Sequence, residues 1–240
     1  MALAPFARPR STLGAVLTPR LVTGAIEDLY DYSALRQLSD ATMFVVTPET
    51  RLLVLGGNQS ESNLSPSGRK WPLRRRRGGG GVVELAPADL WVDFWIPRDD
   101  PRWREDIRAA SSLVGHWWAT SLRALVGADA VVHEGGLEGD PALRVACFAG
   151  RGPGEVFVNE RKAVGVTQWR VREGAFLSTV LRASNSCALV DLLHAPPPAM
   201  FAALDHHSTI SLGVEDAEAL TTDLRDRSGP WRFRSFHLAA

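Results

Sequence analysis

The chain has 240 residues, 45% of them hydrophobic and 22% charged, which predicts one large globular domain with a sizeable core. Its 27 basic and 27 acidic side chains cancel, and this balance argues against nucleic-acid binding through phosphate contacts. The sequence shows no apolar run of membrane-spanning length, and the prolines within residues 1–20 argue against a signal peptide. Cys147 and Cys187 make no disulfide framework, so the cytoplasm is the expected compartment.

Residues 22–38 carry a rough helical stripe of apolar side chains. A polar loop over 56–69 is expected at the surface. Strands are predicted where short apolar runs lie between turn residues: 43–47, 51–55, 82–85, 90–96, 131–133, 144–148, 156–159, 163–167 and 174–181.

The most regular predicted element is a long amphipathic helix. Asp100 is expected as its N-cap with Pro101 at the first helical position, and Gly127 is expected to end it. From Cys187 onward the pattern is helical again, interrupted by the prolines at 196–198. This order of elements predicts an α+β fold with a mixed β-sheet flanked by helices.

A run of four arginines, Arg74–Arg77, leads into four glycines, Gly78–Gly81. Backbone N–H groups of such a loop can converge on an anion, and arginines can pair with a phosphate or carboxylate. No Gly-Lys-Ser/Thr follows, and Val83 replaces the last glycine of a dinucleotide fingerprint, so neither of these phosphate-binding motifs is present. The alternative interpretation is a flexible loop with solvated arginines.

Lysine is rare in this chain, because only Lys70 and Lys162 occur among the 27 basic residues. An ammonium group is a compact charge that can neutralise an oxyanion or a phosphate in a narrow pocket. Lys162 is therefore a candidate catalytic residue, although a lysine left by chance at the surface is the alternative.

Cys147 precedes Lys162 by fifteen residues. A thiolate beside an ammonium would be an activated nucleophile, whereas a cysteine in an apolar strand more often fills a core. Both interpretations stay open for Cys147, while Cys187 is expected to be a packing residue. Asp205 and the histidines 206 and 207 are expected at a surface or helix end, without metal.

Arg-Arg-x-x-Gly-Gly-Gly-x-Val, here Arg74 to Val82, resembles the motif of the lipoate-protein ligase A family, in the biotin/lipoate ligase superfamily. The block from Asn159 to Arg170 resembles the family's Gly-Arg-Lys-Ile-x-Gly-x-x-Gln-Arg sequence. Residues 53–60 resemble its early strand and Gly-x-x-Gln turn. The pair Cys147-Phe148 is similar to one in the octanoyltransferase branch, where the cysteine carries the acyl group.

The resemblance implies the catalytic-domain fold of biotin and lipoate ligases, and it implies roles for residues. Lys162 and Cys147 become catalytic candidates. Contacts to an acyl-adenylate are implied for Arg75, Gly78, Gly79, Gly80, Gly81, Val82, Gly165 and Gln168. It also divides the chain into an N-terminal extension (1–20), a catalytic domain (21–185) and a C-terminal helical segment packed on that domain (186–240).

The implied activity is that of a lipoate-protein ligase, which uses ATP with Mg²⁺ to activate lipoate or octanoate. The acyl group then passes to a lysine of a lipoyl-domain acceptor, a 2-oxoacid dehydrogenase E2 or a glycine-cleavage H-like protein. One alternative is an octanoyltransferase that uses a Cys147 thioester and no ATP. Another is a non-catalytic acyl-binding relative, because Glu84 replaces the family's histidine after the glycine loop.

Overall fold

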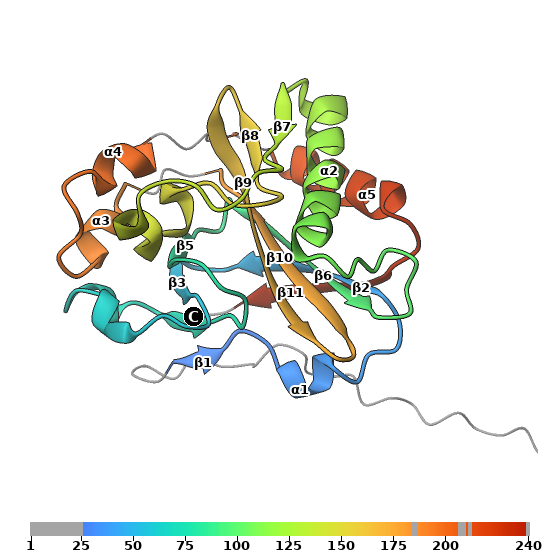
Figure 1. Ribbon diagram of the computed structural model, residues 1–240, viewed down its shortest axis with the longest axis horizontal. Coiled ribbons are helices and arrows are strands. Elements are labelled where there is room, and N and C mark those ends of the chain that lie inside the picture. The colour runs from blue at the N-terminus through green and yellow to red at the C-terminus, as the bar shows by residue number, and fades with distance from the viewer. Residues whose placement is uncertain (1–25, 184–186, 206–209, 211–212, 239–240) are drawn as a thin grey trace, which may run out of the picture.

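A computed structural model describes residues 26–183, 187–205, 210 and 213–238, and two β-sheets form its centre (Figure 1). The large sheet has seven strands in the order β11 (Arg232–Leu238), β2 (Thr42–Pro48), β6 (Leu90–Pro97), β10 (Gly174–Leu181), β9 (Arg161–Val171), β8 (Val156–Val158) and β7 (Ala130–Val132). The small sheet has four, in the order β1 (Glu27–Asp28), β4 (Leu73–Arg75), β3 (Leu52–Leu55) and β5 (Val83–Leu85). Both sheets mix parallel and antiparallel pairs.

Helices complete the layers on both sides of the large sheet. They are α1 (Tyr32–Leu35), α2 (Ile107–Val126), α3 (Leu189–Leu192), α4 (Met200–Asp205) and α5 (Val214–Arg227). The described residues also form short 3₁₀ helices: η1 (Glu61–Asn63), η2 (Gly68–Lys70), η3 (Pro141–Val145) and η4 (Cys147–Ala149).

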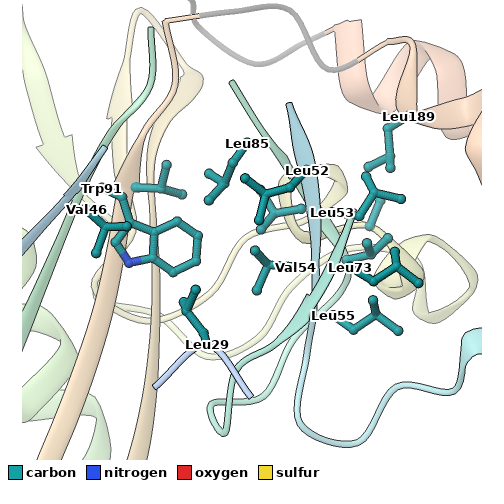
Figure 2. Close-up of a cluster of buried hydrophobic side chains, with 14 of the residues drawn as sticks. Leu29, Val46, Leu52, Leu53, Val54, Leu55, Leu73, Leu85, Trp91 and Leu189 are labelled. Atoms are coloured by element: carbon teal, nitrogen blue, oxygen red, sulfur yellow. The ribbon is translucent and has the colours of Figure 1, made fainter. Parts of the chain in front are cut away.

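The side chains of the large sheet alternate between two hydrophobic cores. Phe44 and Trp91 pack in the core shared with the small sheet and with α3 and α4, where Figure 2 shows Trp91 facing Leu85 and Leu52. Met43 and Val92 pack in the other core, against α2 and α5. All eight residues of β6 are buried for this reason, since both of its faces are covered.

Asp93 is a buried carboxyl in the middle of β6. It accepts hydrogen bonds from the Tyr30 hydroxyl at 2.7 Å, from the Trp91 indole and from the Thr179 backbone N–H. Burial, which the hydrogen bonds only partly offset, raises the pKa of Asp93 from 3.8 to about 7.

The predicted strands at 43–47, 90–96 and 174–181 are confirmed, and so is the end of the long helix at Gly127, whose φ is +62°. The predicted start of that helix is wrong. Asp106 is the N-cap and accepts from Ala109 N–H. Asp100 instead binds the guanidinium of Arg102.

Two further predictions are corrected by the structure. Residues 22–38 do not form one helix; within the described part, β1 pairs in parallel with β4, and Asp31 caps the single turn of α1. Residues 144–148 are not a strand, because Asp140 caps η3, Pro141 opens it, and η4 follows.

The segment 186–240 is not wholly helical, since it ends in β11. This strand pairs in parallel with β2, and Phe236 stacks on Phe44 with ring centroids 6.1 Å apart. The arginine run, expected in a loop, begins in β4, where Arg74 is fully buried and pairs with Glu27. The extension 1–20 and the histidines 206 and 207 lie outside the described residues.

Candidate active site

A cavity of about 480 Å³ lies between the glycine loop, the η3–η4 segment, the loop 150–155 and β9. Among the sequence-predicted residues, the cavity is lined by Gly79, Gly80, Gly81, Cys147, Lys162 and Gln168. The fold therefore brings three separate motifs of the sequence to one place.

Arg76 stabilises the glycine loop through hydrogen bonds to its backbone carbonyls. Its guanidinium is buried and donates to three backbone carbonyls, those of Val54, Gly79 and Gly81, the last at 2.7 Å. Thr167 adds a fourth contact, from its Oγ1 to Gly79 O at 2.9 Å. Side chains of the protein thereby satisfy the carbonyls of Gly79 and Gly81, and the backbone N–H of Gly57 donates to the carbonyl of Gly78.

The backbone N–H groups of Gly79, Gly80 and Gly81 have no hydrogen-bond acceptor among the described residues. Gly80 has φ +89°, a conformation that favours glycine, and a Cβ at Gly81 would approach Ala146 C to 2.4 Å. A Cβ at Gly79 would meet nothing within 4 Å. Three unpartnered donors in a loop on a cavity wall form an arrangement suited to an anion.

Arg75 lies away from the cavity wall, and its guanidinium donates to Gly56 O and to Gln59 O at 2.6 Å. Gly78 packs against Thr167, so no side chain would fit there. Val82 is buried and exchanges backbone hydrogen bonds with Val145 and Cys147. These residues shape the loop, and the direct ligand contacts expected from them stay predictions.

Lys162 is the second residue of β9, a strand that begins directly after the turn at Asn159 and Glu160, whose φ values are +50° and +64°. A register shift between β8 and β9 leaves Ala163 unpaired beside it, a bulge that redirects neighbouring side chains. The ammonium is 5.0 Å from the Phe148 ring centroid. The expected position of Lys162, near a strand end and at the same cavity as the glycine loop, matches the structure.

All three donors of the Lys162 ammonium have acceptors. Nζ lies 2.7 Å from Cys147 O, 3.2 Å from Gly150 O and 2.5 Å from Glu155 Oε1. Glu155 is buried, and its other oxygen accepts from Gly152 N–H at 2.6 Å. Burial raises the pKa of Glu155, and the neighbouring Lys162 ammonium opposes that rise.

Cys147 lines the cavity as a free, partly exposed thiol at the start of η4. The ideal Cβ position at Gly165 is 3.3 Å from the Phe148 ring, so a side chain there would press on that ring, while Cys147 Sγ would be at ordinary contact distance, 3.8 Å. Gln168 donates from its amide to Ile107 O and Ser111 Oγ of α2. The roles expected for Cys147, Gly165 and Gln168 are untested by this geometry.

Glu84 is fully buried on β5 and pairs with Arg51 at 2.7 Å, while its Oε2 has no hydrogen-bond partner among the described residues. It is not among the residues that line the cavity. Glu84, the carboxylate that motivated a non-catalytic interpretation, therefore forms an ion pair with Arg51 away from the cavity.

Sequence reasoning gave no role to several residues that line the cavity, among them Arg144, Arg151, Glu155 and Thr167. Arg144 and Arg151 are exposed cations without a carboxylate partner among the described residues. A signal existed for Glu155 alone, because Glu155 and Lys162 flank two consecutive predicted strands, 156–159 and 163–167, at their N-terminal ends.

The described residues contain no group of three histidine, cysteine or acidic side chains that could hold a metal ion. None of the helices within those residues combines the length and apolarity that a membrane crossing requires. A hollow of about 550 Å³ beside Arg102 and Trp231 is lined by charges that pair with each other, Asp100 with Arg102 and Asp40 with Arg232.

No family model matches the sequence, and no curated protein matches it. Solved structures do. Ta0514 from T. acidophilum, a proposed lipoate protein ligase with bound lipoic acid, has a TM-score of 0.66 and 17% identity, over 86% of this chain and 81% of that chain. Lipoate-protein ligase A bound with ATP has a TM-score of 0.64 and 19% identity, over 87% and 81%.

A third similar structure is a bipartite lipoate protein ligase of Thermoplasma acidophilum, studied with its E2 lipoyl domain. Its TM-score is 0.64 at 18% identity, over 90% of this chain and 88% of that chain. At these identities the likeness establishes the fold. The expected α+β architecture, that of lipoate-ligase catalytic domains, is confirmed.

Proposed function

We propose that this protein is a lipoate-protein ligase-like enzyme, which joins lipoate or octanoate to a lysine of a lipoyl-domain acceptor protein. One observation carries the proposal. A single cavity holds the unpartnered amides of the glycine loop and the Lys162 ammonium, from segments far apart in the sequence. Both groups suit the negative charge that acyl activation and transfer place on phosphate and carbonyl oxygens.

In this proposal the amides of Gly79–Gly81 hold a phosphate group, and Arg144 and Arg151 add positive charge at the same cavity. Lys162 stabilises the oxyanion that forms when the acceptor's ε-amino group attacks the acyl carbonyl. The C–N bond forms as the bond from the acyl carbon to its leaving oxygen breaks, and a proton leaves the attacking nitrogen.

ATP, when bound, supplies the activation of the acyl carboxylate. The free amide donors and the two arginines fit such an anionic ligand. Mg²⁺ would accompany ATP and be held mainly by its phosphates and water. No residue of this chain is assigned as its ligand, because the described residues hold no carboxylate cluster.

The similar structures support the choice of substrates, since they include one with bound lipoic acid, one with bound ATP and one studied with an E2 lipoyl domain. By extension, the acceptor here would be a lipoyl domain of a 2-oxoacid dehydrogenase E2 or a glycine-cleavage H-like protein.

The test is incubation of the protein with an apo lipoyl domain, octanoate, ATP and Mg²⁺, followed by intact-mass measurement of the acceptor. We expect an octanoyl mass gain that disappears when ATP or octanoate is omitted. A gain that requires octanoyl carrier protein, and occurs without ATP, would contradict the ligase. If neither assay shows a mass gain, the protein would match the remaining alternative, a non-catalytic acyl-binding relative.

The second candidate is an octanoyltransferase, favoured by one observation: the Cys147 thiol lines the cavity, and Lys162 binds the carbonyl of the same residue. Its thiolate would attack a carrier thioester, form an acyl–sulfur bond and release the carrier thiol. The acceptor amine would then take the acyl group and return the thiolate. A Cys147 acyl adduct in the protein's mass spectrum, after incubation with octanoyl carrier protein alone, identifies this reaction.

A further inference from the structure

The Lys162 ammonium has no donor left for a ligand. Its three N–H groups bind Glu155 and the carbonyls of Cys147 and Gly150. The two carbonyls belong to the backbone around η4 and cannot change charge. Glu155 is therefore the partner through which the charge of Lys162 can be regulated.

The side chains of Lys162 and Glu155 are both shielded from solvent. The side chains of Lys162 and Glu155 are 4% and 7% exposed, and their charges cancel within the cavity wall. An anion that enters beside them meets a neutral pair, with the carboxylate repelling it. Glu155 is also anchored by Gly152 N–H at 2.6 Å, so movement of the carboxylate out of the pair would cost a second hydrogen bond.

We infer that Glu155 takes up a proton when the anionic acyl substrate binds, which releases the positive charge of Lys162 to the substrate without separating the two side chains. This inference rests on the proposed function. A protonated Glu155 still accepts from Lys162 and from Gly152, so the local geometry survives. Glu155 is thus a positioning residue, because it acts through Lys162.

The sign of the effect follows from linkage. Burial already raises the pKa of Glu155 in the free protein. A substrate carboxylate near it raises that pKa further, so binding is tightest at low pH and weakens as pH rises between the two pKa values. The other charged groups that face this carboxylate or line the same cavity are His133, Glu138, Arg144 and Arg151.

The experiment is calorimetric binding of octanoate to the full-length protein, in buffers of different ionisation heat, between about pH 6 and pH 8. We expect uptake of up to one proton per bound octanoate, and affinity that falls with pH by at most about tenfold per unit. Glu155→Gln should bind octanoate with no proton uptake and little dependence on pH.

Binding by the wild-type protein without proton uptake would overturn the inference, and so would unchanged uptake in Glu155→Gln. If Glu155→Gln does not fold, His133→Gln and Glu138→Gln replace it. Each of these variants should keep the proton uptake of the wild-type protein. Loss of uptake in either variant would assign the proton to the substituted residue and contradict the inference. Failure of the wild-type protein to bind octanoate at all would instead refute the proposed function, and this inference with it.

Discussion

The two walls of the cavity use their hydrogen-bond donors in opposite ways. In the glycine loop, Arg76 donates to the carbonyls of Gly79 and Gly81, and the three backbone amides of Gly79–Gly81 have no acceptor in the described part of the chain. At the Lys162 wall of the same cavity, every donor of the ammonium is engaged within the protein. The glycine loop is ready to receive an anion, whereas the charge of Lys162 becomes available only when its counterion, Glu155, is neutralised. Matching both walls to family motifs does not reveal this difference.

The largest expected effect on turnover comes from removing the Lys162 ammonium. Lys162→Ala should lower turnover by roughly 10² to 10³, as loss of an oxyanion stabiliser does. Lys162→Arg should not restore it, because a planar guanidinium does not fit three acceptors arranged around a point charge. The measurement is the initial rate of acceptor acylation.

The matched control is Lys70→Ala, which removes the other lysine of the chain at an exposed position and should leave the rate unchanged. Because Lys162→Ala leaves Glu155 buried without its cation, its free energy of unfolding should also fall, by about 3–5 kcal/mol. A folded Lys162→Ala protein with normal turnover would refute the catalytic role.

The next prediction tests whether the hydrogen bonds of Arg76 stabilise the glycine loop. Arg76→Leu leaves the carbonyls of Val54 and Gly81 without this donor and the carbonyl of Gly79 with Thr167 alone, which should lower the free energy of unfolding by about 2–4 kcal/mol. Arg75→Leu should cost less, since its contacts lie in a half-buried loop. Thermal and denaturant unfolding of the two variants measures the difference, and equal losses would contradict the role given to Arg76.

Gly79→Leu narrows the cavity without disturbing the loop, because a Cβ there meets no atom within 4 Å. We expect KM for octanoate to rise roughly tenfold, the size of effect that a small change in a hydrophobic pocket produces. Gly136→Leu is the control, since its Cβ would meet only Arg108, at 3.6 Å or beyond. An unchanged KM for Gly79→Leu would place the acyl group elsewhere.

Cys147→Ser separates the two candidate reactions at small cost to the fold. A ligase should keep most of its turnover and lose at most about 1 kcal/mol of stability. A transferase should lose its activity almost completely and form no acyl adduct. The same assay, run with and without ATP, distinguishes these outcomes.

The smallest effect on turnover is expected at Asp93, away from both walls. The pKa of this carboxyl is 3.8 when unperturbed and about 7 in the folded protein. Its contribution to stability is therefore greatest below about pH 4 and is lost as pH rises towards 7, by up to about 4 kcal/mol. Asp93→Asn should flatten this dependence in thermal unfolding while catalysis is unaffected. If the pH dependence of stability persists in Asp93→Asn, a titratable group other than Asp93 causes it.

Much of the large sheet could be predicted from the sequence, because β6 and β10 have the length and apolar content of buried strands. The start of α2 could not, since Asp100 and Asp106 are both suitable caps and only the contact of Asp100 with Arg102 decides between them. The β4 strand was hidden because its arginines look solvated, although Arg74 is buried.

Within the site, the position of Lys162 and of the glycine loop followed from the motifs. Arg75 and Glu155 did not, for a common reason. Whether a charged side chain contacts a ligand or another part of the protein depends on partners distant in sequence, such as Gln59 for Arg75. A motif preserves the residue type but not the direction in which its side chain points.

The pairing of β11 with β2 has a consequence for how the chain folds. The partners Thr42 and Arg232 are at opposite ends of the sequence, so this edge of the large sheet can close only after nearly all of the chain is available. Such non-local pairing is slow to form. Until it does, β2 presents an open edge, and Phe44 lacks the Phe236 ring that stacks on it. A nascent or truncated chain that stops before Arg232 should therefore be prone to self-association, even with its cavity residues intact.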